Sequence, residues 1–172
     1  MITISKPTLE DTEGMNEVIK LSWYQTYITP EIRVTKKDID LMYANSEAKQ
    51  TEAFRRRIEN PKDGDVTLVA KDENKVVGVI RLVVNSDHIR VRTVYVHPDY
   101  VGKEIGTSLW NEVQQYLPEK LPIIAYPVKQ TRSVDWYKKI GFTLTGEENT
   151  EEEKMLDSRV QLTVTKMIYK RD

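Results

Sequence analysis

The longest strand-like stretch of the chain, residues 65–96, limits the fold more than any other part of the sequence. It reads "DVTLVAKDENKVVGVIRLVVNSDHIRVRTVYV", and apolar and polar residues alternate in three runs of strand length. The turn-forming segments "DENK" and "NSDH" separate the runs. Because runs joined by such short turns pair with their neighbours in the chain, the stretch predicts three consecutive antiparallel strands.

Helical and strand-like patterns lie on both sides of this stretch. Before it, a short strand and three helices are predicted, the third beginning at Ser46 and ending at Asn60-Pro61. After it, the patterns alternate between helix and strand and end in two strands with an acidic surface loop over 147–158 between them. The expected helices are 7–27, 31–43, 46–60, 105–117 and 131–141, and the further strands are 2–6, 121–126, 142–147 and 159–170. This order is typical of a mixed α/β (α+β) fold.

Composition excludes several classes of function. The 172 residues suit one domain over 1–172, and a net charge of −1 without a basic stripe argues against nucleic acid as a partner. No apolar run is long enough for a membrane span and the N-terminus carries acidic residues, so a cytoplasmic protein without membrane contact is expected. The absence of cysteine and the presence of only two histidines predict no metal site.

The segment "YVHPDYVGKEIGTSLW", residues 95–110, is the first candidate for a binding site. It reads as the end of a strand, a loop with Gly102 and Gly106, and the start of an amphipathic helix. Free N–H groups at a helix N-terminus bind anions, and glycine lets the backbone approach a phosphate closely. The alternative is a tight turn that only requires the conformational freedom of glycine. The spacing matches neither the phosphate loop of nucleotide triphosphatases nor the dinucleotide fingerprint.

A second segment adds weight to the binding interpretation. About 30 residues later, a short helix carries Trp136 and Tyr137 and ends at Gly141-Phe142. Together, "VYVHPDYVGKEIGT" and "QTRSVDWYKKIGF" resemble the signature of the GNAT superfamily of N-acetyltransferases. The resemblance implies a mostly antiparallel sheet of six to seven strands, splayed between the fourth and fifth, with four to five flanking helices.

The resemblance also implies a cofactor, acetyl-CoA, and a set of residues that hold it. Val94, Tyr95 and Val96 form the strand that pairs with the cofactor and polarises the acetyl carbonyl. Tyr137 donates a proton to the departing sulfur, whereas a plain core aromatic is the alternative for this residue. The remaining cofactor-binding residues implied are Val101, Gly102, Lys103, Glu104, Ile105, Gly106, Thr107, Gln130 and Ser133.

Three positions depart from the family pattern. Val101 stands where arginine or glutamine is usual, and Glu104 replaces a glycine, which hinders a positive φ and places a carboxylate near the phosphates. We expect Glu104 to point outward and Lys103 to offset its charge. Arg90 occupies the position where many members carry a glutamate base, which leaves Asp87, His88 or water as alternatives.

The acceptor is the least determined part of the reaction. In the family, the first helix, the loop after it and the second helix wall the acceptor pocket, so Tyr24, Tyr27 and Ile28 are the candidate contacts. The segment "SWYQTYITPE" is also similar to polyamine-type members. The expected partner is an amine, either a small molecule or a peptide N-terminus or lysine, and the choice between monomer and homodimer is left open. The rival hypothesis is a GNAT-like binding or regulatory module without catalysis.

Overall fold

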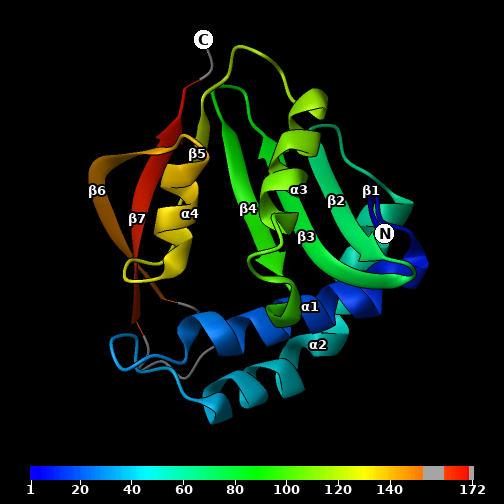
Figure 1. Cartoon of the computed structure of the whole chain (residues 1–172), viewed down its shortest axis with the longest axis horizontal. Coiled ribbons are helices and arrows are strands. Elements are labelled where there is room, and N and C mark those ends of the chain that lie inside the picture. The colour runs from blue at the N-terminus through cyan, green and yellow to red at the C-terminus, as the bar shows by residue number, and fades with distance from the viewer. Residues whose placement is uncertain (153–160, 171–172) are drawn as a thin grey trace.

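A seven-stranded sheet in the order β1-β2-β3-β4-β5-β7-β6 runs through the middle of the protein, with helices on both of its faces (Figure 1). The computed structural model describes residues 1–152 and 161–170. The strands are β1 (Ile2–Ser5), β2 (Asp65–Asp72), β3 (Lys75–Val84), β4 (Ile89–Val96), β5 (Ile123–Ala125), β6 (Thr143–Glu152) and β7 (Gln161–Tyr169). The helices are α1 (Thr12–Tyr27), α2 (Lys36–Glu59), α3 (Ile105–Val113) and α4 (Arg132–Lys139), with 3-10 turns at Leu9–Asp11, Pro98–Tyr100 and Gln114–Tyr116.

The strand-like stretch 65–96 folds as predicted, into the antiparallel strands β2, β3 and β4. The two predicted turns join them, and Ala70 pairs with Gly78, which in turn pairs with Val96. The β3–β4 ladder is interrupted once, because Arg81 pairs with Thr93 and Leu82 with Val91. Arg92 is therefore the extra residue of a β-bulge, a feature that re-aims side chains and is common beside active sites.

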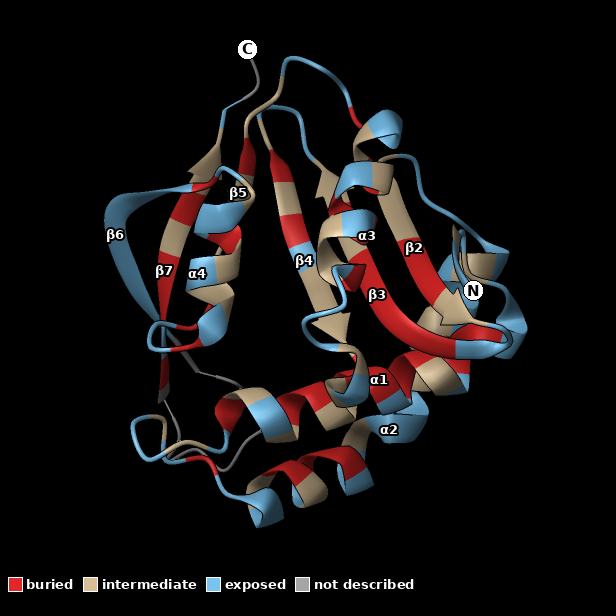
Figure 2. Ribbon diagram, viewed as in Figure 1, coloured by how far each residue is buried: buried red, intermediate tan, exposed pale blue. Residues whose placement is uncertain are grey.

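Alternate side chains of the sheet enter two separate hydrophobic cores, and buried residues accordingly recur along the central strands (Figure 2). On one face, Ile80 packs in the core that includes Leu109 and Trp110 of α3 and Tyr137 of α4. On the other face, Val79 packs in the core of α1 and α2. The period of two seen in the sequence thus positions different helices on opposite faces.

The sheet opens between its fourth and fifth strands, as the family resemblance implied (Figure 1). β4 and β5 run parallel and pair only at Ile89 with Ile123 and at Arg90 with Ile124. Beyond Arg90, β4 continues for six residues to Val96 with no β5 partner. The backbone groups on that edge of β4 therefore face an opening.

Two sequence-based expectations about element boundaries are wrong. Residues 31–43 and 46–60 were expected to form separate helices, but α2 is one helix that begins after a Thr35–Asp38 capping box. Ser46 does not cap a new helix, because its hydroxyl donates to the carbonyl of Met42 one turn earlier, at 2.7 Å. The expected acidic loop over 147–158 is strand as far as Glu152, and its remainder lies outside the described residues.

Within the described part of the chain, no helix is long and apolar enough to cross a membrane.

Candidate active site

The free edge of β4 presents backbone hydrogen-bonding groups to the opening. The N–H of His97 donates to the carbonyl of Val77 on β3 at 2.9 Å. Because backbone groups alternate in direction along an antiparallel strand, those of Tyr95 also face β3, whereas those of Val94 and Val96 face the opening. The hydroxyl of Ser22 on α1 lies 2.8 Å from the Val96 carbonyl and 2.7 Å from the Val18 carbonyl, and it can donate its one proton to either. The N–H groups of Val94 and Val96 are thus directed at the space between β4 and β5.

The N-terminus of α3 lies beside the same opening and offers more donors. Glu104, which precedes the helix, makes no side-chain capping bond. Among the described residues, no backbone acceptor is found for the N–H groups of Ile105, Gly106 and Thr107. A helix start with uncapped N–H groups and a positive dipole end binds anions such as a pyrophosphate.

The two glycines of this loop serve different purposes. Gly102 has φ +84°, a left-handed conformation, and a Cβ there would meet nothing within 4 Å. Backbone conformation alone explains this glycine. At Gly106, a Cβ would lie 3.4 Å from the indole nitrogen of Trp136. Gly106 therefore lets α4 pack closely against the start of α3.

Glu104 is accommodated differently from the sequence-based expectation. Its backbone adopts φ 58° and ψ 13°, the left-handed conformation that a glutamate was expected to hinder. The side chain is exposed, as expected, but Lys139 of α4 pairs with it at 3.0 Å. Lys103 was expected to offset this charge, yet its ammonium lies 4.5 Å above the ring of Tyr100. Lys139, first, and then Thr107 hold the pKa of Glu104 below its usual value.

Tyr137 belongs to a hydrophobic core and to the wall of the opening at once. It is 7% exposed, and its ring packs edge-on against Trp136 and Phe142. Burial raises the pKa of Tyr137 above the usual 10.0. Among the described residues, no hydrogen-bond partner is recorded for its hydroxyl. The phenol is therefore a group that keeps its proton at neutral pH and faces a cavity.

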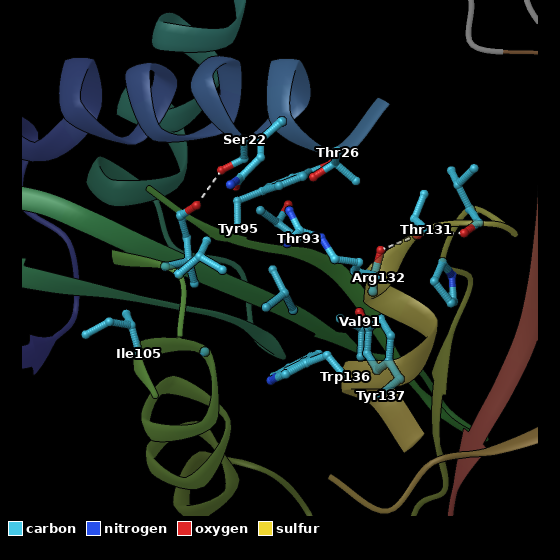
Figure 3. Close-up of a pocket in the computed structure, with 18 of the residues that line it drawn as sticks. Ser22, Thr26, Val91, Thr93, Tyr95, Ile105, Thr131, Arg132, Trp136 and Tyr137 are labelled. Carbon is cyan, nitrogen blue, oxygen red and sulfur yellow. Dashed lines mark hydrogen bonds between the residues drawn. The ribbon is translucent and has the colours of Figure 1, made fainter. Parts of the chain in front are cut away.

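The cavity in the opening has a volume of about 440 Å³ and continues across the sheet. Figure 3 shows Ser22 and Thr26 of α1 on one side of β4, and Ile105 and Trp136 on the other. Most of the residues predicted for the site line this cavity, namely Tyr27, Val94, Tyr95, Val96, Val101, Gly102, Glu104, Ile105, Gly106, Thr107, Gln130, Ser133 and Tyr137.

Three residues predicted for the site do not line this cavity. Lys103 stacks on Tyr100, as described, and Ile28 is 40% exposed at the end of α1. Tyr24 donates a hydrogen bond to Asp40 of α2, and burial, followed by this hydrogen bond, raises the pKa of Tyr24 to about 12. Tyr24 thus connects α1 to α2 and does not point into the cavity.

The side chains considered as a general base also lie away from the cavity. Asp87 and His88 form a pair at 2.8 Å in the turn between β3 and β4. At about 3.3 Å per residue along β4, this turn lies roughly 20 Å from Val94. Arg90, at the base of the opening, stacks on the ring of Tyr126 with 3.6 Å between guanidinium and ring centroid. Glu104 is the one carboxylate among the described residues that line the cavity.

Several lining residues escaped the sequence reasoning. Ser22, Gln25 and Thr26 lie on α1 close to the predicted contacts Tyr24 and Tyr27, and Arg92 and Thr93 lie on β4. No signal in the sequence distinguishes Ser22, which is 4% exposed, from the other buried polar residues of α1, Thr12 and Asn16. No sequence signal marks the bulge that places Arg92. No group of three or more potential metal ligands occurs among the described residues.

Solved structures share this fold along the whole chain. The PaiA N-acetyltransferase of Thermoplasma acidophilum, determined in complex with coenzyme A, is 23% identical with a TM-score of 0.76, and 99% of each chain is covered. A GCN5-related N-acetyltransferase from Rhodopseudomonas palustris is 22% identical with a TM-score of 0.72, over 98% of this chain and 94% of that one. The ribosomal-protein-S18-alanine N-acetyltransferase of Escherichia coli is 13% identical with a TM-score of 0.65, over 99% and 94%.

Among curated protein sequences, no significant match to the chain was found. The family model described as "Acetyltransferase (GNAT) domain" matches residues 34–162, which include the free edge of β4, the α3 loop and Tyr137. The geometry agrees with acetyl-CoA as the cofactor, because uncapped helix N–H groups and a free strand edge meet at one cavity. The chain belongs to the GNAT family and is an acetyl-CoA-dependent N-acetyltransferase.

Proposed function

We propose that the chain, acting as a single domain over residues 1–172, transfers the acetyl group to a primary amine while both substrates are bound. The observation that carries this proposal is the cavity, which has cofactor-type contacts at α3 and β4 and a second wall on α1. When bound, acetyl-CoA supplies an acetyl group that is activated as a thioester. An amine that enters from the α1 side can then meet this group without a covalent enzyme intermediate.

The backbone supplies most of the cofactor contacts in this proposal. The N–H groups of Ile105, Gly106 and Thr107 bind the pyrophosphate, since they have no backbone acceptor among the described residues. The N–H groups of Val94 and Val96 orient the pantetheine arm and polarise the acetyl carbonyl. Backbone donors do not depend on side-chain identity, and this is consistent with Val101 replacing a polar residue.

Tyr137 holds the proton that the leaving sulfur requires. Burial raises the pKa of Tyr137, so its Oη remains protonated at neutral pH. A phenol in that state can donate to a departing thiolate.

The proton of the attacking amine follows a different path. Glu104 is 60% exposed and paired with Lys139, so it is unsuited to act as a base for the amine. No histidine is found among the described residues that line the cavity. We propose that water in the open cavity removes this proton. The acceptor beyond the class of primary amines, a homodimer and a cytoplasmic location stay predictions from the sequence.

Substitution of Tyr137 tests the proposed proton donor. Tyr137→Phe keeps the ring contacts with Trp136 and Phe142 but removes the hydroxyl. We expect kcat for CoA release to fall about 100-fold or more, with little change in the Kd for acetyl-CoA. The matched control is Tyr116→Phe, at an exposed tyrosine outside the cavity lining. Unchanged turnover in Tyr137→Phe would contradict the proposed proton donor and would mean that Tyr137 has only a structural role.

A further inference from the structure

A second cavity adjoins the one described above. It has a volume of about 280 Å³ and lies between the sheet and the helices α1 and α2. The two cavities share three lining residues of β4, namely Arg92, Thr93 and Tyr95. A molecule that reaches the acetyl group from the α1 side therefore passes beside this second cavity.

The second cavity is rich in positive charge. Arg57 of α2, Arg81 of β3 and Arg92 of β4 line it together with aromatic side chains, and no carboxylate is found among its described lining residues. Arg81 forms a bidentate ion pair with Asp65. Its Nε and Nη2 donate to the two carboxylate oxygens at 2.8 and 2.7 Å. Both side chains of that pair are more than four-fifths buried. The Arg81 guanidinium is thus held in place and internally neutralised.

Among the described residues, Arg57 and Arg92 have no such partner. Within residues 1–152 and 161–170, neither forms an ion pair, and the recorded contact of Arg57 is with the ring of Phe54 at 5.8 Å. The charged groups that act on Arg57 are Arg81, Asp65 and Arg92. Desolvation and the two neighbouring guanidinium groups lower the pKa of Arg57. An arrangement of three arginines with one carboxylate costs free energy unless another anion joins it.

The backbone also brings Arg92 to this position. Arg92 is the extra residue of the β4 bulge, between Val91 and Thr93, and its side chain is exposed. In a regular strand, the consecutive side chains of Arg92 and Thr93 would point to opposite faces of the sheet, whereas at the bulge both line the two cavities.

We propose that the acceptor of this enzyme is a small primary amine that carries an anionic group, a carboxylate or a phosphate, and that Arg57 and Arg92 bind this group. The inference rests on the proposed acetyl transfer and specifies its substrate class. Guanidinium groups bind carboxylate and phosphate oxygens through two parallel hydrogen bonds. The anion occupies the arginine-rich cavity, and the amine extends past Thr93 into the opening beside β4.

This assignment differs from a polyamine acceptor. A polyamine carries further ammonium groups, which the guanidinium groups of Arg57 and Arg92 repel. The segment "SWYQTYITPE", which is similar to polyamine-type members, lines the main cavity through Ser22, Gln25, Thr26, Tyr27 and Thr29. It contributes only Trp23 to the lining of the arginine-rich cavity. The residues that line the second cavity come instead from α2, β3 and β4 as well as from α1.

The test compares amines that differ only in charge. Phosphoethanolamine is paired with ethanolamine and β-alanine with propylamine, and spermidine serves as the cationic probe. Binding is measured by calorimetry on the CoA-saturated protein, and turnover by CoA release from acetyl-CoA. We expect the anionic member of at least one pair to bind about tenfold or more tightly than its neutral partner.

Two charge-removing variants locate the effect. Arg92→Gln and Arg57→Gln are each expected to remove most of the preference for the anionic amine, by raising its Kd and KM about tenfold, while the Kd for acetyl-CoA stays the same. The matched control is Arg56→Gln, which removes the neighbouring charge on α2. Arg56 pairs with Glu52 at 2.9 Å and does not line the cavity, so the preference is expected to remain.

The outcomes separate this inference from the proposed function. Acetylation of neutral amines or spermidine with equal or better efficiency would overturn the inference and leave acetyl transfer intact. Absence of binding by every anionic probe would overturn it as well. If anionic amines bind through Arg57 and Arg92 but none releases CoA, the arginine site stands and the proposed transfer to these amines fails.

Discussion

Glu104 shows that one residue can depart from a family motif without closing the site. It occupies the left-handed conformation that a glycine adopts more readily, at φ 58°. Its carboxylate lies near the predicted pyrophosphate site, where a like charge weakens binding. Lys139, from the next helix, neutralises this charge at 3.0 Å. The loop and α4 therefore act together, and the sequence of the loop alone misidentifies the compensating lysine.

The Glu104–Lys139 pair leads to a prediction about cofactor affinity. Lys139→Gln leaves the carboxylate unmatched and is expected to raise the Kd for acetyl-CoA several-fold, whereas Glu104→Gln is expected to lower it. Both effects should shrink as salt is raised, because the pair is exposed and screened. Isothermal titration at low and high salt measures this, with Lys138→Gln on the same helix as the control. Equal affinities in Lys139→Gln and the wild type would contradict the compensation.

The pKa of Tyr137 leads to a prediction about pH dependence. Because burial raises this pKa above 10.0, the hydroxyl stays protonated, and therefore competent as an acid, through neutral and moderately alkaline pH. The alkaline decline of kcat that reports Tyr137 is expected to lie above pH 10, and Tyr137→Phe should lack it. A decline of kcat at neutral pH that disappears in Tyr137→Phe would mean that the pKa of Tyr137 is lowered, which would contradict this prediction.

At the scale of elements, the close approach of α3 to β3 positions the N-terminus of α3, where the pyrophosphate is proposed to bind. A Cβ at Gly78 would lie 2.9 Å from Cγ2 of Ile105 and 3.0 Å from Cδ1 of Leu109. Gly78 also pairs with Val96, at the end of the free strand edge. Because it lacks a side chain, Gly78 thus lets the first turn of α3 pack beside the backbone N–H groups of β4.

Enlarging Gly78 tests this close approach. Gly78→Val is expected to lower the free energy of unfolding by about 1–3 kcal/mol, since the added methyl groups overpack the contact with α3. The Kd for acetyl-CoA should rise as well, because the first turn of α3 is displaced. Denaturant titration and calorimetry measure the two effects. A variant with unchanged stability and affinity would show that the contact between β3 and α3 accommodates a larger side chain, and would contradict this account.

How far the sequence predicts each element depends on whether local signals or tertiary contacts determine it. The three strand-length runs over 65–96 and the turn segments between them predicted β2, β3 and β4, because both signals are local in the sequence. The single helix α2 was divided at Ser46, because a serine can cap a helix or bond back to the preceding turn, and tertiary packing decides between the two. The bulge at Arg92 has no local signal at all.

At the scale of the molecule, the opening between β4 and β5 joins the two faces of the sheet. α3 and α4 lie on one face and α1 and α2 on the other, and the main cavity takes residues from both (Figures 1 and 3). Motif matching predicted the proposed cofactor contacts, because these residues are close together in the sequence. The proposed acceptor side combines residues of α1, α2, β3 and β4 that long-range packing brings together, so the sequence predicted only part of it.

The measurement that most directly tests this account is amide hydrogen exchange with and without acetyl-CoA. The N–H groups of Val94 and Val96 face the opening, whereas that of Tyr95, between them, faces β3. Saturating acetyl-CoA is expected to slow exchange at Val94, Val96 and residues 105–107 by about tenfold or more and to leave Tyr95 nearly unchanged. Unaltered exchange at Val94 and Val96 in the saturated protein would contradict the placement of the cofactor in this opening.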